Sequence, residues 1–161
     1  MNDAQFSLCN RYRYWLRRDL VPWEVNPLKI VWLMLNPSTA DCTVNDPTIK
    51  QCMAFSTLWG YHCMDVVNVY AWRATDPRAL RHASDSIGPA NDNWIHSTVY
   101  DATLVMCAWG AHKIPPERLA TLRHILAGKT LACLGTTKSG MPWHPLYRPH
   151  HLGPTTWSFP T

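Results

Sequence analysis

The stretch KIVWLMLNPSTAD at residues 29–41 decides the fold, because an uninterrupted apolar run ends directly at Asn36. A continuous apolar run of this length is typical of a strand that is buried on both faces of a parallel sheet. Three similar runs follow along the chain. Together they predict four buried strands, at Lys29 to Leu35, Met64 to Tyr70, Thr103 to Ala108, and Thr130 to Leu134.

Helical segments with recognisable ends separate these runs. The first is expected from Pro47, capped by Asp46, to a stop at Gly60. A second is expected from Gly88-Pro89 through about Tyr100, and a third from Pro115-Pro116 through Ala127. The alternation predicts a single α/β domain over residues 1–161, with a three-layer α/β/α, Rossmann-like architecture and a central, mostly parallel, four-stranded sheet. The segments before Asn26 and after Pro149 are expected to wrap the sheet.

The composition favours a soluble protein of the reducing cytoplasm. Hydrophobic residues make up 47% of the 161 residues and charged residues 16%, which argues against long disordered tails. We see no signal peptide and no apolar run of membrane length, and therefore expect no membrane association. The six cysteines form no C-x-x-C pair, so we expect no structural zinc, no other metal and no cofactor.

Basic residues give a net charge of +4 and gather in two places in the sequence. Such clusters suit an anionic partner, but a solvated face produces them more often. The clusters are Arg11, Arg13, Arg17 and Arg18 near the front, and Arg73, Arg78 and Arg81 in the middle of the chain.

Polar and aromatic residues follow each predicted strand. Because ligands of open parallel sheets bind beyond the carboxyl ends of the strands, these residues are expected around one crevice. Loops are polar in any such fold, which is the ordinary alternative. The segments are residues 36–41 after the first strand, 68–73 at the second, 109–112 after the third, and 135–145 after the fourth.

Two asparagines and a histidine stand out in these segments. Asn36 and Asn68 each come directly after an apolar run, where an amide must find a hydrogen-bond partner. An amide offers a donor and an acceptor together, which matches the edge of a nucleobase. His144 can stabilise a developing negative charge as a neutral donor.

Other candidate residues have simpler interpretations. Ser38 lacks the surrounding glycines of an esterase nucleophile and is expected at a turn or cap. Lys138 could touch a phosphate, although no standard phosphate loop surrounds it. His144, His150 and His151 lack carboxylate or thiolate partners at metal-binding spacing. The chain has nine tryptophans, and Trp109 is either a stacking surface for a base or part of loop packing.

Most of the chain resembles a known family of bacterial and phage proteins, domain-of-unknown-function family 1643. The resemblance extends from about Arg11 to Tyr147 and implies no activity by itself. The segments that carry it are Leu35 to Asp41, Asn45 to Ile49, Trp59 to Tyr61, Val67-Asn68, Arg73 to Pro77, Gly88 to Asp92, Ala108 to Ala111, and His144 to Tyr147.

The order of four of these motifs is also similar to that in the uracil-DNA glycosylase superfamily. An N-P motif, an asparagine, a W-G-A-H segment and an H-P motif follow the four predicted strands in turn. This resemblance implies that Asn36 orients a water molecule, Asn68 reads a flipped base and His144 binds the leaving base, with Phe55 or Trp109 as a stacking surface. The other residues that we assign to ligand binding are Pro37, Ser38, Asp41, Arg73, Lys138, Pro145 and Tyr147.

Three functions are consistent with these observations. The first is a DNA glycosylase-like enzyme that hydrolyses the N-glycosidic bond of a modified or damaged base. The second is a module that binds a nucleotide or modified base without cleaving it, such as a sensor in phage and host conflict. This alternative is motivated by Asn36 in place of an acid and by Leu146-Tyr147 after the H-P motif. The third is a protein-binding partner with exposed tryptophans.

Overall fold

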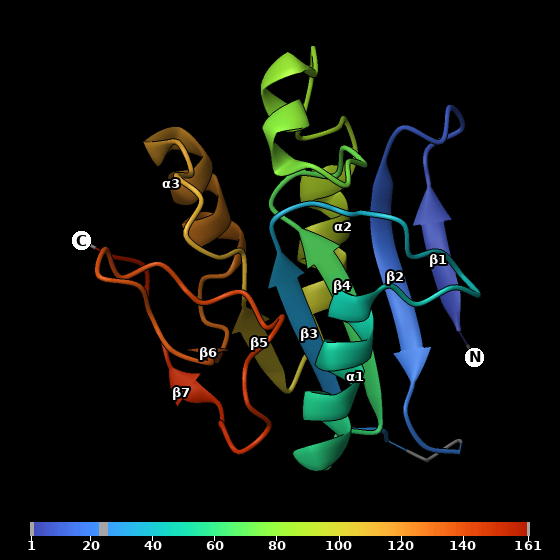
Figure 1. The fold of residues 1–161 in the computed structure, drawn as a ribbon, viewed down its shortest axis with the longest axis vertical. Coiled ribbons are helices and arrows are strands. Elements are labelled where there is room, and N and C mark those ends of the chain that lie inside the picture. The colour runs from blue at the N-terminus through green and yellow to red at the C-terminus, as the bar shows by residue number, and fades with distance from the viewer. Residues whose placement is uncertain (1, 23–25, 161) are drawn as a thin grey trace.

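A computed structural model describes residues 2–22 and 26–160 of the chain. Its centre is a seven-stranded mixed sheet with the order β1-β2-β4-β3-β5-β6-β7 (Figure 1). The strands are β1 (Asp3–Phe6), β2 (Arg13–Asp19), β3 (Lys29–Met34), β4 (Cys63–Asn68), β5 (Leu104–Cys107), β6 (Leu131–Cys133) and β7 (Thr155–Thr156).

The four predicted strands correspond, in chain order, to β3, β4, β5 and β6. In the sheet they lie side by side in the order β4-β3-β5-β6, and each neighbouring pair is parallel. The prediction of a four-stranded sheet is nevertheless wrong, because the described residues form three further strands. β1 and β2 add an antiparallel hairpin at one edge, and β7 pairs antiparallel with β6 at the other. The fold is therefore mixed α/β, with parallel pairing confined to the middle of the sheet.

Helices cover both faces of the sheet (Figure 1). Helix α1 (Pro47–Leu58) packs on one face, where Ile49, Cys52 and Phe55 join the core with Trp32 and Val66. Helices α2 (Asn91–Val99) and α3 (Pro116–Ile125) pack on the other face. A 3-10 helix, Pro77–His82, lies between β4 and α2. We refer to the two sides as the α1 face and the α2 face.

Local sequence signals set the ends of α1. The Asp46 carboxylate accepts a hydrogen bond from the Ile49 backbone N–H at 2.9 Å, and Pro47 occupies the first turn, as predicted. The chain leaves the helix through Gly60, whose φ of 79° favours glycine. Helices α2 and α3 begin and end within a few residues of their predicted limits.

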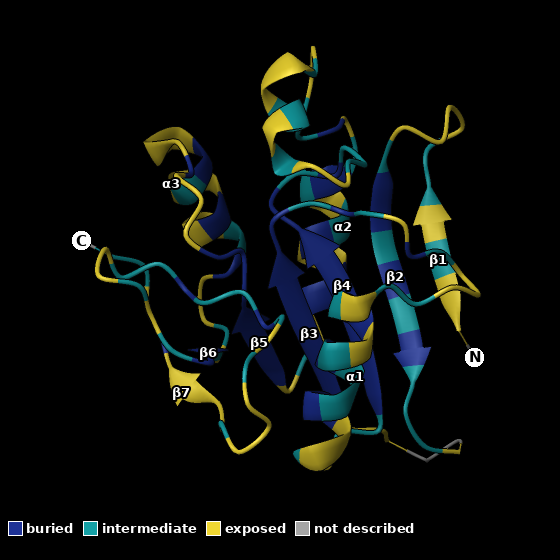
Figure 2. Ribbon diagram, in the orientation of Figure 1, coloured by how far each residue is buried: buried dark blue, intermediate teal, exposed yellow. Residues whose placement is uncertain are grey.

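Burial follows the layers (Figure 2). Strands β3 and β4 are buried along their whole length, which explains their continuous apolar sequence. Three residues of these strands are polar but are buried like their apolar neighbours. They are Lys29, Asp65 and Asn68. Among the described residues, no helix has the length and apolar character needed to span a membrane.

Candidate functional site

A cavity of about 500 Å³ lies at the carboxyl ends of β3, β4 and β5, beside the N-terminus of α1. This volume falls within the roughly 300–1,000 Å³ range of small-molecule sites. Its position is that expected for ligands of parallel sheets. The wall is formed by Arg13, Met34 to Asn36, Ser38, Thr39, Asp46 to Ile49, Val66, Asn68, Ala74, Thr75, Pro77, Trp109 to His112, His144 and Leu146.

Asn36 lies just beyond β3, where its side chain joins two loops. The amide Nδ2 donates to the carbonyl of Ala74 at 2.8 Å and to that of Pro37 at 3.1 Å. These bonds identify Nδ2 as the end of the amide that faces the backbone. They leave the Oδ1 acceptor free to receive a hydrogen bond from another group.

Asn68, the last residue of β4, is 1% exposed and lines the cavity. Met64 and Val66 belong to the core on the α1 face, so the alternation of β4 places the Asn68 side chain on that face too. Its Oδ1 and Nδ2 are both buried, and neither has a hydrogen-bond partner among the residues that the structure describes. Such an amide costs stability in the absence of a ligand, which makes it an unusual residue for a strand end.

Trp109 also lines the cavity, although its side chain belongs to the core on the α2 face. The residue is 0% exposed, and its Nε1 has no hydrogen-bond partner among the described residues. Its ring packs against Trp157 and Phe159, with centroid distances of 5.2 and 6.2 Å. Packing by the C-terminal segment therefore covers much of the ring.

His144 enters the cavity from the loop after β6. This loop folds back at Gly135, where a Cβ atom would lie 2.6 Å from the Trp143 ring, so only glycine fits. The Nδ1 of His144 accepts a hydrogen bond from the Leu146 backbone N–H at 3.2 Å. In the neutral ring the proton is consequently on Nε2, which is available as a donor.

The electrostatic surroundings keep this imidazole neutral. Burial lowers the pKa of His144 from its ordinary value, and His112 and Arg148 act in the same direction. Asp46 acts in the opposite direction and is the smaller influence compared with burial. His144 can thus donate a hydrogen bond at neutral pH without adding a charge.

Two charged residues of the cavity wall, Asp46 and Arg13, were missed by reasoning from the sequence. Asp46 was explained fully as a helix cap, and the structure shows that the capping carboxylate also lies at the cavity wall. Arg13 was assigned to a basic cluster, although it is 2% exposed and lines the cavity. No local sequence pattern signals that an arginine at the start of an edge hairpin points inward.

Seven residues predicted to bind the ligand lie outside the cavity wall, and three of them, Phe55, Pro37 and Asp41, have other roles in the fold. Phe55 is buried in the core beside Trp32 and Trp59, so its ring has no free face for a base. Pro37 is buried and contributes its carbonyl to Asn36 and Ala74. The carboxylate of Asp41 accepts the backbone N–H groups of Thr43 and Val44, which lowers the pKa of its carboxyl.

The remaining predicted residues lie around the cavity or away from it. Ser38 belongs to the wall. Arg73 lines a neighbouring groove, where it donates to the Asn10 carbonyl and lies 4.8 Å from the Phe6 ring centroid. Tyr147 lines another groove and is 91% exposed. Outside the wall, Pro145 is buried beside His144 and Lys138 is exposed in the loop after β6.

The described residues contain no group of three histidine, cysteine or carboxylate side chains placed to hold a metal ion. All six cysteines are free thiols, and Cys52, Cys63, Cys107 and Cys133 are buried. Burial raises the pKa of each of these four thiols. They are packing residues in this fold.

The fold and the cavity define a mixed α/β protein with a ligand-sized site at the ends of its parallel strands. The chain belongs to the family described as "Protein of unknown function (DUF1643)", whose match covers residues 13–146. That range includes every residue of the cavity wall, from Arg13 to Leu146. No curated protein and no solved structure matches the chain.

Proposed function

We propose that the protein recognises a nucleobase in the cavity at the ends of β3, β4 and β5. The observation that carries this proposal is the amide of Asn68, whose donor and acceptor are both buried without a partner. A base edge presents a complementary acceptor and donor side by side. Binding it would remove the cost of leaving the amide unpaired.

Two other groups of the wall fit the same ligand. His144 offers an Nε2 donor, and Asn36 offers an Oδ1 acceptor. Carbonyl oxygens and ring nitrogens of a base accept the donors, and an amino group or ring N–H can bind the acceptors. The apolar walls from Met34, Val66 and Ile49 suit the faces of a flat ring.

Hydrolysis of the N-glycosidic bond is a second candidate function. A water molecule held by Asn36 Oδ1 would attack the anomeric carbon while the base leaves with the electron pair of the C–N bond. His144, neutral and donating, would stabilise the charge that develops on the base. Asn36 cannot accept the proton of the water, so this proton would pass to solvent and the departing base would take up a proton from solvent. The rate would then depend on orientation and charge stabilisation.

The resemblance to the uracil-DNA glycosylase superfamily supports both candidates. In that superfamily an N-P motif, a base-reading asparagine and an H-P motif follow successive strands, which suggests a similar strand layout for β4, β3, β5 and β6. In this chain Asn36, Asn68 and His144 line a common cavity. Recognition requires only these contacts, whereas cleavage also requires a bound water, so recognition is the better supported function.

A panel of nucleobases and nucleosides tests the proposal by thermal shift and calorimetry. We expect at least one base to raise the melting temperature of the wild type and to lose at least tenfold in affinity in Asn68→Leu. Ser56→Ala is a matched control, because Ser56 is buried in α1 and bonded to Trp32, outside the cavity wall. If no base or nucleoside binds, or if Asn68→Leu binds as well as the wild type, the proposal is wrong.

Product analysis separates the two candidates. The wild type is incubated with modified nucleosides and with single-stranded and duplex DNA that carry modified bases. A free base or an abasic site, absent in Asn36→Ala and His144→Ala, would indicate hydrolysis. A ligand that binds and is recovered intact would indicate recognition without cleavage.

A further inference from the structure

A β-bulge in β2 turns Arg13 toward the α1 face. Gln5 of β1 pairs with Trp15, whereas the next residue, Phe6, pairs with Arg13, so Tyr14 is an extra residue in β2. If Tyr14 instead paired regularly with Phe6, strand alternation would place Arg13 on the same face as Trp15. Bulges are frequent beside functional sites, where they re-aim a side chain.

The position of Arg13 agrees with this register. Its Nη1 donates to the carbonyl of Ala40 at 2.7 Å, in the loop between β3 and α1. On the far side of the bulge, Arg18 donates to the carbonyl of Asp41 in that same loop. Both arginines therefore reach the α1 face, but of the two only Arg13 lines the cavity.

The guanidinium of Arg13 is buried with few partners. The residue is 2% exposed, its Nε is buried without a hydrogen-bond partner, and it forms no ion pair with any described residue. Burial lowers the pKa of Arg13 to about 10, so the group still carries its charge at neutral pH. The nearby carboxylates of Asp46 and Asp41 favour its charged form without forming an ion pair with it, and a buried charge without a directly paired opposite charge is costly to a fold.

Other buried arginines of the chain are paired much more completely. Arg18 donates from its Nε and both Nη atoms to Asn45 and to three backbone carbonyls. Arg118 donates from Nε and Nη2 to the Val69 carbonyl and forms an ion pair with Asp92 at 2.6 Å. Arg13 is the exception among the three, and the difference is that it faces the cavity.

The part of the wall near the β3–α1 loop offers further donors for an anion. The hydroxyl groups of Ser38, Thr39 and Thr75 line the same cavity and can donate hydrogen bonds. In the first turn of α1 the Ile49 N–H is bonded to the Asp46 carboxylate and Pro47 has no N–H, which leaves the N–H of Thr48 for a ligand. Asp46 keeps its negative charge while it caps α1, so an anion would bind on the side of the cavity nearer to Arg13 and the hydroxyl groups.

We propose that Arg13 binds a phosphate group of the ligand, so that the cavity accepts a nucleotide in preference to a free base or nucleoside. The inference rests on the proposed function, because the base of this nucleotide is the one that Asn68 reads. The phosphate comes either from a mononucleotide or from a phosphodiester of a single strand, and the chemistry that Arg13 recognises is the same in both.

Calorimetric titrations test the proposal with matched ligands. For each of the four common bases and uracil, the nucleoside is compared with its 5′- and 3′-monophosphates at constant ionic strength, because phosphate binding depends on salt. Ribose 5-phosphate and inorganic phosphate report binding without a base. A set of four-nucleotide single strands reports phosphodiesters. The proteins are the wild type, Arg13→Met and, as the matched buried control, Arg18→Met, each checked for folding by circular dichroism.

We expect at least one phosphorylated ligand to bind the wild type tenfold or more tightly than its nucleoside. Arg13→Met should lose this preference while it keeps the affinity for the nucleoside, and Arg18→Met should retain the preference. If Arg13→Met does not fold, Arg13→Lys should keep part of the preference, because it keeps the charge without the planar fork. A stronger response to monophosphates than to tetranucleotides assigns the phosphate to a free nucleotide, and the reverse assigns it to a strand.

Equal affinity for nucleosides and their phosphorylated forms in the wild type would overturn the inference and leave base recognition intact. A phosphate preference that survives in Arg13→Met would overturn it as well. If ribose 5-phosphate binds as tightly as every nucleotide, the anion site stands and base recognition fails. If no ligand of the panel binds, both proposals fail.

Discussion

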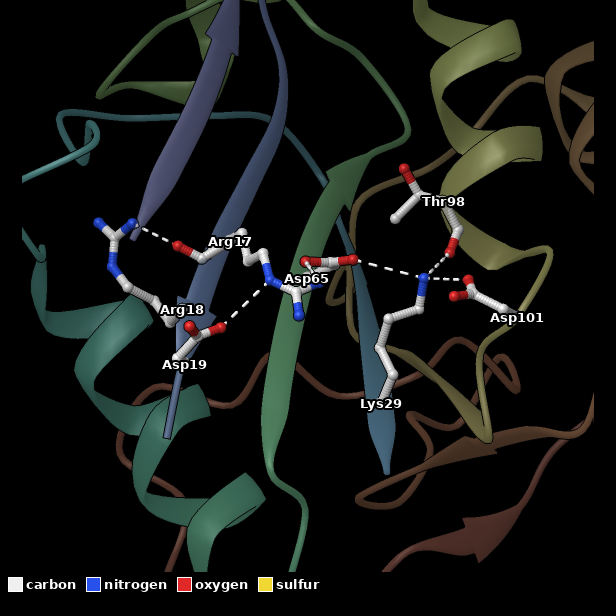
Figure 3. Close-up of polar contacts among 7 residues, drawn as sticks. All are labelled: Arg17, Arg18, Asp19, Lys29, Asp65, Thr98 and Asp101. Carbon is white, nitrogen blue, oxygen red and sulfur yellow. Dashed lines mark hydrogen bonds and ion pairs between the residues drawn. The ribbon is translucent and has the colours of Figure 1, made fainter. Parts of the chain in front are cut away.

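Two groups of polar side chains lie on opposite faces of β2 and β4, and they differ in whether they form ion pairs. On the α1 face, Arg13 and Asn68 border the cavity with polar atoms that have no hydrogen-bond partner among the described residues. On the α2 face, Arg17 and Asp65 belong to a cluster with Lys29 and Asp101, which we call the charge cluster (Figure 3). Asp65 Oδ1 also lacks a hydrogen bond there, but it lies 3.5 Å from the opposite charge of Arg17.

Asp65 is the centre of the charge cluster. Its two carboxylate oxygens lie 3.5 Å from Arg17 Nη1 and 3.5 Å from Lys29 Nζ. Lys29 also donates to the Thr98 carbonyl at 2.8 Å and to the Asp101 carboxylate (Figure 3). Burial raises the pKa of Asp65, and the charges of Lys29 and Arg17 oppose this effect.

This difference in pairing suggests that the charge cluster stabilises the fold and that the residues at the cavity bind a ligand. In the charge cluster each ion has at least one partner of opposite charge, so the cluster holds β2, β3, β4 and the end of α2 together without a ligand. In the cavity the unpaired atoms belong to different strands and loops but face one space. A ligand is the partner that would complete them.

The largest effect is expected from breaking the charge cluster. Asp65→Ala leaves Lys29 and Arg17 without their shared buried partner and should lower the free energy of unfolding by about 3 kcal/mol. Urea denaturation measures the change. Arg78→Ala, which removes the exposed pair with Asp76, should cost less than about 1 kcal/mol. Equal effects of the two substitutions would contradict the structural role of the cluster.

A smaller effect of opposite sign is expected at Asn68. Asn68→Leu removes an unpaired buried amide and should raise the free energy of unfolding by about 1 kcal/mol while it weakens base binding at least tenfold. Asn91→Leu is the contrasting substitution, because Asn91 donates to the carbonyls of Asn68 and Val69 and should lose about 1 to 2 kcal/mol. Denaturant unfolding of the two variants compares them. Destabilisation by Asn68→Leu would indicate that the amide is paired in solution.

The pH dependence of binding should report His144. Its pKa in the folded chain lies below the ordinary value of about 6.5, so the neutral donor is present throughout the range above that value. Base affinity should be constant above about pH 6.5 and fall at lower pH, as the pH approaches the lowered pKa. The unfolded chain binds the proton more readily, so the contribution of His144 to stability also falls below about pH 6.5. Calorimetry from pH 8 to pH 5 measures the affinity, and His144→Gln should flatten the profile.

The smallest effect on stability is expected at the exposed rim. Tyr147 is 91% exposed, so Tyr147→Asn should change the free energy of unfolding by less than about 0.5 kcal/mol. Asparagine tolerates the φ of 63° at this position. If Tyr147 contacts the ligand, as its place after the H-P motif suggests, the variant should still weaken binding to single strands. An unchanged affinity would restrict the site to the cavity itself.

The parallel strands and the ends of α1 were predictable because local signals specify them. Apolar runs of four to seven residues marked β3, β4 and β5, and the Asp46-Pro47 pair marked the start of α1. The hairpin of β1 and β2 was missed because charged residues recur through it. Arg17 and Arg18 make β2 look like an exposed segment in the sequence. Their partners, Asp65 and Asn45, are distant in sequence, so no local pattern shows that the two arginines lie in a largely buried strand.

The candidate site was predictable in position and less so in membership. Asn36, Asn68 and His144 follow apolar runs, and the rule for parallel sheets places such residues on one edge. Phe55 followed from the resemblance alone, and its burial depends on the packing of α1, which no local pattern specifies. Arg13 could not be identified because its direction depends on strand register, a property of the pairing between β1 and β2.

The bulge at Tyr14 makes the register of β2 as important as its composition. If the same residues paired regularly with β1, Tyr14 would oppose Phe6 and the guanidinium of Arg13 would lie on the opposite side of the sheet. A chain that paired in this way would retain the sequence of the wall and yet lose the only arginine that the described residues place there. Deleting Tyr14 would instead keep Arg13 opposite Phe6, so the register of this hairpin, and not its residue count, decides which relatives can share the ligand.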